Sequence, residues 1–199
     1  MAYQRKDSYY ARAKASGYRS RAAFKLQELA RKYQLIRRGD HVVDLGAWPG
    51  GWLQVAGELV GAHGLVVGVD LQPIERLSGA MIATLVGDAR QPAVQDELRE
   101  RCGGRIDVVL SDMAPKLSGV RDSDMARAAE LAETAVALGE RLLGPGGRLL
   151  VKVFSGAESE ALAAARRLFT STKLTKPDAS RKESAEMYLI GIGRRAAGG

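Results

Sequence analysis

The sequence has very few of the residues that build disulfides and zinc sites. Its 199 residues include one cysteine, Cys102, and two histidines, His41 and His63. A single cysteine cannot form an internal disulfide, and these three residues do not have the spacing of zinc ligands. We therefore expect no metal site. The cysteine usage is typical of a reducing, cytoplasmic environment.

Long hydrophobic runs are also missing. No apolar stretch approaches the roughly 20 residues that a membrane-spanning helix needs. The first residues, MAYQRKDSYYARAK, are polar and basic and lack the apolar centre of a secretory signal peptide. We therefore expect a cytoplasmic protein that does not insert into a membrane.

Acidic residues are scarce in the first fifth of the chain. Residues 1–38 contain eleven Lys and Arg and only two acids, which gives this segment a net charge of +9. The whole chain has a net charge of +7, so the remaining residues sum to −2. Tyr3, Tyr9, Tyr10 and Tyr18 are interleaved with these cations. Cations that bind phosphates and rings that stack on bases suit RNA better than a merely solvated surface. The expected RNA contacts in this arm are Arg5, Lys6, Arg12, Lys14, Arg19 and Arg21.

Expected strands and helices alternate through most of the chain. The hydrophobic periodicity predicts helices at 19–35, 50–60, 92–101, 123–143 and 157–169. It predicts strands at 41–45, 65–70, 81–86, 105–112, 148–154, 171–176 and 186–193. Alternation indicates a mostly parallel sheet with helices on both faces. The last two strands have no helix between them, so we expect the last strand to be antiparallel.

This pattern predicts a single α/β domain over residues 1–199. Seven strands with the last one reversed resemble the Rossmann-like class I S-adenosylmethionine-dependent methyltransferase fold. An NAD-binding Rossmann domain would normally carry six parallel strands. The first fold is therefore the one that we expect.

A candidate cofactor site follows the first three strands. Three glycines in DLGAWPGGW (44–52) permit a tight turn and the close approach of a ligand, although a plain strand-to-helix turn is the alternative. The dinucleotide pattern G-x-G-x-x-G is absent, because Trp48 stands where its second glycine should be. At the ends of the next two strands, Asp70 could accept hydrogen bonds from ribose hydroxyls and Asp88 from an adenine amino group. The sequence therefore favours an adenosine cofactor without phosphates.

Candidate catalytic residues follow from a lysine inside an apolar strand. Lys152 interrupts LLVKVF, where a lysine needs a partner or a function. Asp112 ends the neighbouring strand, and Glu186 begins the reversed strand at the same edge, so we expect all three to converge. Lys25 lies at the margin of the apolar face of the first helix and could reach this edge. The alternatives are a structural ion pair for Lys152 and an ordinary solvated lysine for Lys25.

Six segments together resemble one protein family. They are SRAAFKLQE (20–28), DLGAWPGGW (44–52), VDLQP (69–73), SDMAPKLSG (111–119), LLVKVFSG (149–156) and KPDASRKESAEMYLI (176–190). In this order they resemble the FtsJ/RrmJ (RlmE) family of ribosomal RNA 2′-O-methyltransferases over nearly the whole chain. The resemblance implies S-adenosylmethionine as cofactor. It implies a uridine ribose in large-subunit (23S) ribosomal RNA as substrate, on the assembled or assembling 50S subunit.

The resemblance also implies roles for individual residues. The implied catalytic tetrad is Lys25, Asp112, Lys152 and Glu186. The implied cofactor contacts are Gly50, Trp52, Asp70, Asp88 and Asp112. Two residues depart from the family pattern, because a small residue is usual at Trp48 and asparagine is common at Lys116.

We interpret Lys152 as the proton acceptor from the ribose hydroxyl. Steering of the hydroxyl and stabilisation of its developing negative charge is the alternative role. A late loop with Lys176, Arg181 and Lys182 is expected to bind phosphates together with the basic arm.

Three other functions remain open at this point. A nicotinamide-dependent oxidoreductase is disfavoured by the missing glycine pattern and the reversed last strand. A catalytically silent RNA-binding assembly factor is disfavoured by the complete tetrad. A relative that methylates transfer RNA, another RNA or a messenger cap is disfavoured only weakly, by the compact length. We expect the protein to be a monomer.

Overall fold

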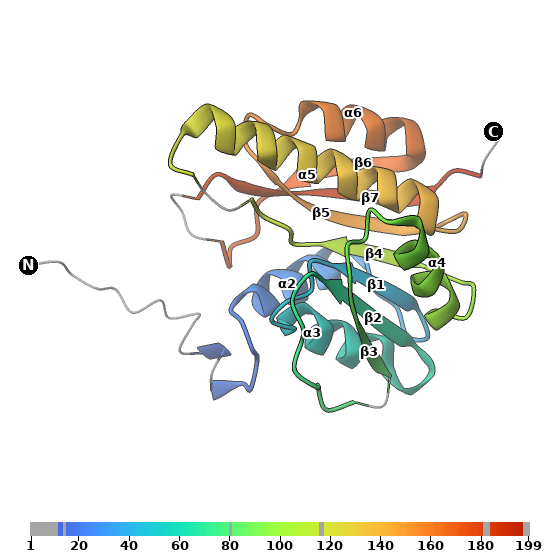
Figure 1. Ribbon diagram of the computed structural model, residues 1–199. Coiled ribbons are helices and arrows are strands. Elements are labelled where there is room, and N and C mark those ends of the chain that lie inside the picture. The colour runs from blue at the N-terminus through green and yellow to red at the C-terminus, as the bar shows by residue number, and fades with distance from the viewer. Residues whose placement is uncertain (1–11, 14, 80, 116–117, 181–183, 197–199) are drawn as a thin grey trace, which may run out of the picture.

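The fold is centred on one seven-stranded sheet. The computed structural model describes residues 12, 13, 15–79, 81–115, 118–180 and 184–196 (Figure 1). The strands are β1 (His41–Leu45), β2 (Leu65–Asp70), β3 (Ile82–Val86), β4 (Val108–Ser111), β5 (Arg148–Phe154), β6 (Phe169–Thr175) and β7 (Glu186–Arg194). Their order in the sheet is β3-β2-β1-β4-β5-β7-β6.

The last strand is inserted between two earlier ones and runs against both. β7 is antiparallel to β5 and to β6, whereas the pairs formed among β1 to β5 are all parallel. The expected seven-stranded sheet with a reversed last strand is therefore confirmed. The reversal brings the beginning of β7 to the edge at which the parallel strands end.

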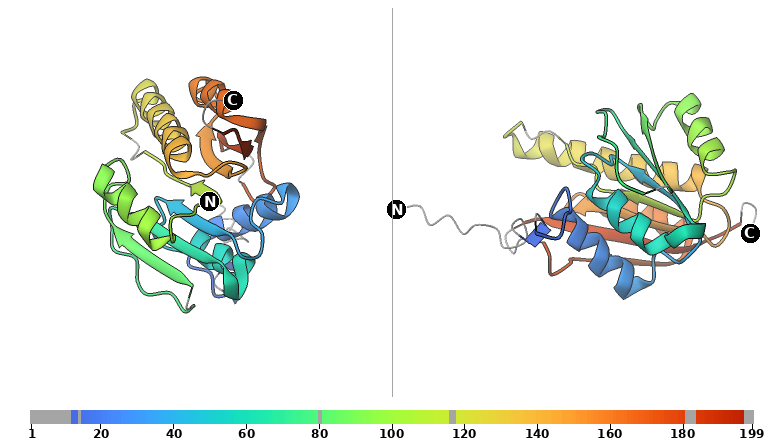
Figure 2. Two further views of the ribbon diagram at one scale, coloured as in Figure 1. Left: turned by 90° about the vertical axis from the view of Figure 1, so that its right-hand side faces the viewer. Right: turned by 90° about the horizontal axis from the view of Figure 1, so that it is seen from below.

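Helices cover both faces of the sheet (Figures 1 and 2). They are α2 (Ala22–Tyr33), α3 (Gly51–Val60), α4 (Pro92–Arg101), α5 (Arg121–Leu142) and α6 (Ser159–Leu168), with a short 3₁₀ turn, η1 (Gly61–His63). α2 and α3 pack on one face, and α4, α5 and α6 pack on the other. No helix in the described part of the chain combines the length and the apolar character needed to cross a bilayer.

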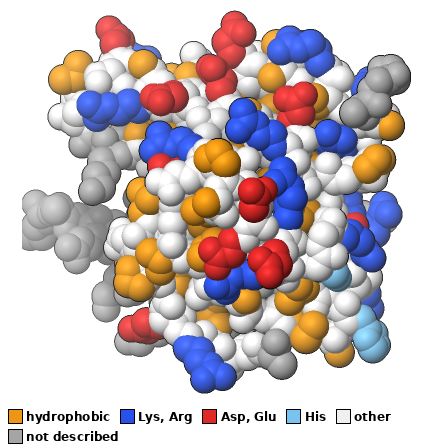
Figure 3. Space-filling model, turned by 45° about the vertical axis from the view of Figure 1, so that its right-hand side comes forward, with side chains coloured by type: hydrophobic (Ala, Val, Ile, Leu, Met, Phe, Trp, Pro, Cys, Tyr) orange, Lys and Arg blue, Asp and Glu red, His pale blue; other side chains and the backbone are white. Residues whose placement is uncertain are grey.

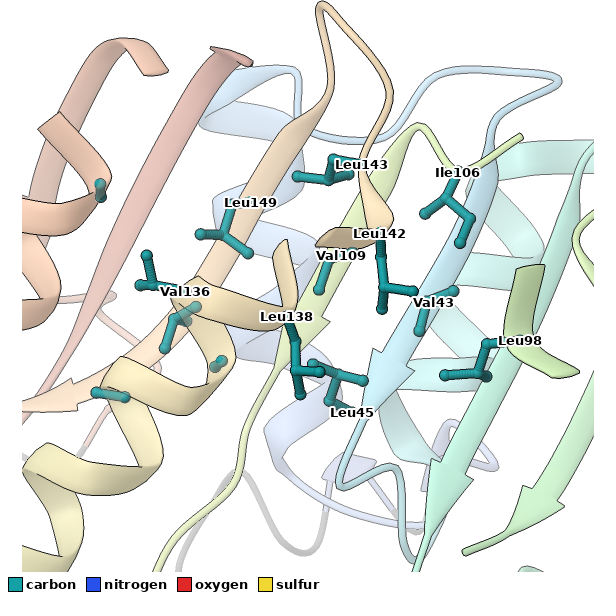
Figure 4. Close-up of a cluster of buried hydrophobic side chains, with 14 of the residues drawn as sticks. Val43, Leu45, Leu98, Ile106, Val109, Val136, Leu138, Leu142, Leu143 and Leu149 are labelled. Carbon is teal, nitrogen blue, oxygen red and sulfur yellow. The ribbon is translucent and has the colours of Figure 1, made fainter. Parts of the chain in front are cut away.

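Alternation along the strands creates the two cores. Val43, Val109 and Leu149 point toward α5 and α4 and pack with Leu138 and Leu98 (Figure 4). The apolar residues next to them in the strands belong to the other core, under α2 and α3: Val42, Val108, Leu110 and Leu150. Because successive side chains point to opposite faces, both sides of these central strands must be apolar.

Two expected elements begin three residues later than the sequence indicates. The first helix begins at Ala22 rather than at residue 19, because the Arg19 amide donates a hydrogen bond to the Gln54 side chain (2.9 Å). The fourth strand is Val108–Ser111 rather than 105–112. At its beginning, the Asp107 side chain accepts hydrogen bonds from the His41 amide and the Arg105 guanidinium. A polar side chain thus accepts a backbone N–H at both boundaries.

A buried ion pair joins the strands at the opposite edge from the candidate site. The Arg148 guanidinium at the beginning of β5 lies 2.9 Å from Asp40 Oδ1, just before β1, and both side chains are more than nine-tenths buried. The other oxygen of Asp40 accepts a hydrogen bond from the Arg37 amide (2.6 Å). Nε and Nη1 of Arg148 are buried without a partner among the described residues. Asp40 is therefore the group that compensates this buried positive charge.

Candidate active site

The carboxyl ends of the central strands gather a group of charged side chains. Asp112 follows β4, Lys152 lies near the end of β5, and Glu186 begins β7 opposite Phe154. Lys25 reaches the same place from α2. Four residues that are far apart in the sequence thus meet at one edge of the sheet.

The distances within this tetrad are short. Lys152 Nζ donates a hydrogen bond to the Asp112 backbone carbonyl (2.6 Å) and lies 3.2 Å from Asp112 Oδ1. It lies 3.9 Å from Glu186 Oε1, and the other oxygen of Glu186 is 2.8 Å from Lys25 Nζ. The expected convergence is confirmed, while the catalytic roles of the four residues stay predictions. Two ammonium groups and two carboxylates make a nearly neutral set.

Lys25 is more deeply placed than the sequence indicated. It was expected at the margin of the apolar face of α2, but it is 96% buried, next to Phe24 and Leu26, which are also buried. Its Nζ lies 5.9 Å from the centre of the Tyr188 ring. Because a buried lysine needs a counter-charge, the ion pair with Glu186 explains how it is tolerated there.

Glu186 is held in its ionised form. Burial alone would raise the pKa of this carboxyl. The hydrogen bond and charge of Lys25, the charge of Lys152 and a hydrogen bond from Ser184 together keep the pKa below its ordinary value. A carboxylate that stays ionised orients both lysines.

Tyr188 is a fifth member of this cluster that the sequence reasoning missed. Its hydroxyl donates a hydrogen bond to Asp112 Oδ1 (2.9 Å), and its ring is fully buried. Burial, followed by the negative charges of Asp112 and Glu186, raises the pKa of Tyr188 well above its ordinary value, so the hydroxyl remains a donor. Strand periodicity could have found it, because Tyr188 shares a face with Glu186 and pairs with Lys152 across the strands.

Two cavities adjoin the tetrad. The larger, about 510 Å³, has among its lining residues Gly46, Asp70, Asp88 and Met113. The smaller, about 230 Å³, is lined by residues that include Ser20, Asp44 and Trp52. Three residues line both cavities: Gly46, Trp48 and Asp112. The two cavities therefore meet beside the tetrad.

The two acids proposed for an adenosine both line the larger cavity. Asp70 accepts hydrogen bonds from the backbone amides of Trp48 (3.0 Å) and Gln72 (2.8 Å), which fix its carboxylate. The Asp88 carboxylate pairs with Arg90 at 2.7 Å, and the hydrogen bonds from Arg90 lower the pKa of Asp88. Arg90 also lines the cavity and was not foreseen.

Of the two other proposed cofactor contacts, Trp52 lines a cavity and Gly50 does not. The buried Trp52 indole donates a hydrogen bond to the Ala22 carbonyl (2.8 Å) and lines the smaller cavity. Gly50 is buried and is absent from the lining of both cavities. Its φ of 107° is one that a side chain rarely adopts, so the glycine serves the turn that begins α3.

Asp44 is the most informative residue that the sequence reasoning missed. It is 99% buried, and among the described residues no group donates a hydrogen bond to either carboxylate oxygen. Burial, followed by the charges of Asp112 and Asp70, raises its pKa well above the ordinary value. An unpartnered buried acid beside a cavity is suited to a cationic ligand. Its signal was an acid inside the apolar strand HVVDL, the same signal that singled out Lys152.

We expect Asp44→Asn to stabilise the ligand-free protein at neutral pH. The raised pKa means that the folded state binds the proton more tightly than the unfolded state, so stability falls as pH rises above the ordinary value of 3.8. Removing the charge should raise the free energy of unfolding at pH 7 by at least about 1 kcal/mol, or about 2–4 °C in Tm. The gain should shrink toward pH 4. Thermal unfolding between pH 4 and 8 measures this, with the exposed Asp96→Asn as control, and a gain independent of pH would contradict it.

The described part of the basic arm is partly engaged within the protein. The Arg19 guanidinium donates hydrogen bonds to the backbone carbonyls of Pro49, Glu75 and Arg76 at 2.7–3.1 Å. It therefore anchors two loops, and its proposed phosphate contact competes with this role. Arg12 is exposed and lies 4.6 Å from the centre of the Phe24 ring.

The remaining proposed RNA contacts are distributed between described and undescribed segments. Arg21 is partly buried, and Lys176 is exposed and donates a hydrogen bond to the Ser184 carbonyl (2.6 Å). Arg5, Lys6, Lys14, Arg181 and Lys182 lie outside the described residues. Figure 3 shows one face of the molecule, on which acidic and basic side chains are interspersed.

Glu28 connects the late loop to α2. Its two carboxylate oxygens accept hydrogen bonds from the backbone amides of Asp178 (3.0 Å) and Ala179 (3.2 Å). The sequence reasoning did not assign this residue a role. The contact holds the loop that carries Lys176 beside the helix that carries Lys25.

Comparisons with known proteins agree with this architecture. The chain is 51% identical over 192 residues to the ribosomal RNA large subunit methyltransferase E of Methanothrix thermoacetophila, a match that covers 96% of this chain and 74% of that protein. It is 47% identical over 192 residues to the protein of the same name from Methanothermobacter thermautotrophicus, covering 96% and 91%.

Solved structures share the fold. A chain from Plasmodium falciparum described as a ribosomal RNA methyltransferase superposes with a TM-score of 0.79 at 26% identity, covering 89% of this chain and 98% of that one. Aeropyrum pernix fibrillarin in complex with S-adenosyl-L-methionine has a TM-score of 0.61 at 18% identity, covering 88% and 75%, which shows the fold alone. Residues 18–194 match the sequence profile of FtsJ-like methyltransferases. The chain therefore belongs to the FtsJ-like methyltransferase family.

Proposed function

We propose that the protein transfers a methyl group from S-adenosylmethionine to the 2′-hydroxyl of a uridine in large-subunit ribosomal RNA. The observation that carries this proposal is the tetrad of Lys25, Asp112, Lys152 and Glu186 at the junction of two cavities. Family membership and the relatives named ribosomal RNA large subunit methyltransferase E support the reaction and the class of RNA.

The larger cavity and its neighbour fit S-adenosylmethionine. Asp70 and Asp88 present carboxylate oxygens suited to ribose hydroxyls and an adenine amino group. Asp44 offers an unpartnered buried acid to the positively charged methionine end. When bound, the cofactor supplies a methyl group that its sulfonium activates for transfer to a nucleophile.

The chain must then supply position and proton removal, because a ribose hydroxyl is a weak nucleophile. In its neutral amine form, Lys152 Nζ is the group placed to receive the hydroxyl proton and so become an ammonium. Asp112 and Glu186 orient it, Lys25 balances Glu186, and the Tyr188 hydroxyl fixes the carboxylate of Asp112. The fixed geometry removes the cost of ordering these groups during the reaction.

A second role for Lys152 also follows from the geometry. Its ammonium donates to the Asp112 backbone carbonyl, which leaves further N–H groups for the substrate oxygen. In that case Lys152 would steer the hydroxyl and stabilise developing negative charge. The two roles differ in whether a permanent cation at this position can replace the lysine.

The test is methyl transfer from methyl-labelled S-adenosylmethionine to large ribosomal subunits that lack the modification. We expect label in the RNA, recovered as a 2′-O-methyluridine nucleoside. Free ribosomal RNA, transfer RNA and capped messenger RNA, incubated in parallel, distinguish the proposed substrate from other RNA substrates. Label in transfer RNA alone would assign the protein to that substrate class.

Two further outcomes would overturn the proposal. Cofactor binding without label in any RNA would favour a catalytically silent assembly factor. Stabilisation by a nicotinamide dinucleotide instead of S-adenosylmethionine in a thermal-shift measurement would favour an oxidoreductase. The cytoplasmic location, the monomeric state and the single domain over residues 1–199 stay predictions.

A further inference from the structure

Exposed large hydrophobic side chains gather at the edge of the sheet that carries the tetrad. In the described ranges these are Trp48, Leu71, Val86 and Val120, each more than half exposed. Trp48 follows β1, Leu71 follows β2, Val86 ends β3 and Val120 precedes α5. Single exposed apolar residues are common, but their restriction to one edge indicates a surface that binds a partner.

Trp48 has the most specific position of the four. It is 53% exposed, and it lines both the cavity that contains Asp70 and the cavity that contains Asp44. Its backbone amide is fixed by the hydrogen bond to Asp70. The indole therefore lies where the two cavities meet, beside Asp112 of the tetrad.

The indole of Trp48 has no partner within the described part of the protein. No aromatic ring or cation stacks on it there, and its ring nitrogen has no hydrogen bond. The protein's other tryptophan, Trp52, is 97% buried, is hydrogen-bonded and packs against Tyr188. Packing within the protein accounts for the presence of a tryptophan at position 52 but not at position 48. A ligand with a flat apolar face is therefore the natural partner for Trp48.

We propose that Trp48 stacks on the base of the nucleotide whose ribose is methylated. This inference rests on the proposed function and adds the residue that holds the base while Lys152 acts on the ribose. Trp48 lines both cavities beside Asp112, and more than half of its surface is exposed to solvent, where an RNA base can reach it. A base of the RNA fits this boundary better than the adenine of the cofactor. Stacking tolerates any base, so Trp48 contributes affinity and position rather than sequence recognition.

Steady-state kinetics with large ribosomal subunits test the inference. For Trp48→Ala we expect KM for the subunits to rise about 10-fold or more, from the loss of one stacked base. The dissociation constant for S-adenosylmethionine should change less than about 2-fold. Trp48→Phe keeps a stacking ring and should remain within about 3-fold of the wild type. Asp96→Ala changes an exposed side chain of α4 that lines neither cavity, so it should leave KM unchanged.

Tryptophan fluorescence tests the contact without catalysis. The difference between the spectra of wild type and Trp48→Phe isolates Trp48, because the only other tryptophan is Trp52. Titration with the trinucleotide UpUpU in the presence of S-adenosylhomocysteine should quench this component. An unquenched Trp48 signal at saturating trinucleotide would overturn the inference.

The outcomes separate this inference from the proposed function. An active enzyme in which Trp48→Ala leaves KM unchanged would overturn the stacking role alone. If Trp48→Ala weakens S-adenosylmethionine binding but leaves KM for the subunits unchanged, the indole contacts the cofactor, and the stacking role is also overturned. If the wild type methylates no RNA, the proposed function fails, and the trinucleotide titration still decides whether Trp48 stacks on a base.

Discussion

Replacing Lys152 by alanine is expected to lower kcat for methyl transfer by about two to four orders of magnitude, the range of general acid–base catalysis. The physical reason is that Lys152 Nζ lies among Asp112 and Glu186 at the junction of the cavities, where a ribose hydroxyl would meet the methyl group. The dissociation constant for S-adenosylmethionine should stay nearly unchanged. Single-turnover methyl transfer and calorimetric cofactor binding measure the two effects separately.

Two matched variants sharpen this prediction. Lys173→Ala removes an exposed lysine from β6 and should leave turnover unchanged. Lys152→Arg keeps a permanent positive charge but cannot accept a proton. Turnover as low as that of the alanine variant would support the base role, whereas substantial activity would support steering. Near-normal turnover of Lys152→Ala, with the cofactor bound, would contradict both roles.

Replacing Asp40 by alanine is expected to lower the free energy of unfolding by about 3–5 kcal/mol. The change leaves the Arg148 guanidinium, 95% buried, without its carboxylate partner, while two of its nitrogens already have no described partner. It also removes the acceptor of the Arg37 amide. For a chain of this length the loss corresponds to a fall in Tm of about 10 °C. Urea unfolding followed by circular dichroism measures it.

The control for Asp40 is an exposed ion pair. Asp96→Ala removes the partner of Arg99, whose side chain is 39% exposed, and should cost less than about 1 kcal/mol. The double variant Asp40→Ala with Arg148→Met should recover much of the lost stability, because no uncompensated charge remains. Equal losses for Asp40→Ala and Asp96→Ala would show that burial of the Arg148 pair is energetically unimportant.

The fold was predictable because its signals are local. Apolar strands separated by helical patterns indicate a parallel sheet, and two final strands without a helix between them require a reversal. The position of β7 between β5 and β6 is consistent with these signals but was not determined by them. Strand order depends on which apolar faces meet, and local periodicity contains no information about that.

Part of the candidate site was predictable because a charge inside an apolar strand is also a local signal. Lys152 stood out because a charged residue inside an apolar strand needs an explanation, and Asp112 and Glu186 followed from the common edge of the strands. Asp44 carries the same signal in β1, but the acid was interpreted as part of the glycine turn. Tyr188 was missed because a tyrosine in a strand is typical of any core, and only its place on the same strand face as Glu186 pointed to the site.

The sequence by itself determined the class of fold, the edge of the sheet that carries the chemistry and the residues that could perform it. Only the tertiary structure decided which of them meet. It buried Lys25 against Glu186, tied the Arg19 guanidinium to three backbone carbonyls, and left the Trp48 indole exposed between two cavities. The reason is that burial and partners are properties of packed surfaces. Those surfaces are assembled from segments that are distant in the chain. A local sequence pattern does not show which of these segments come into contact.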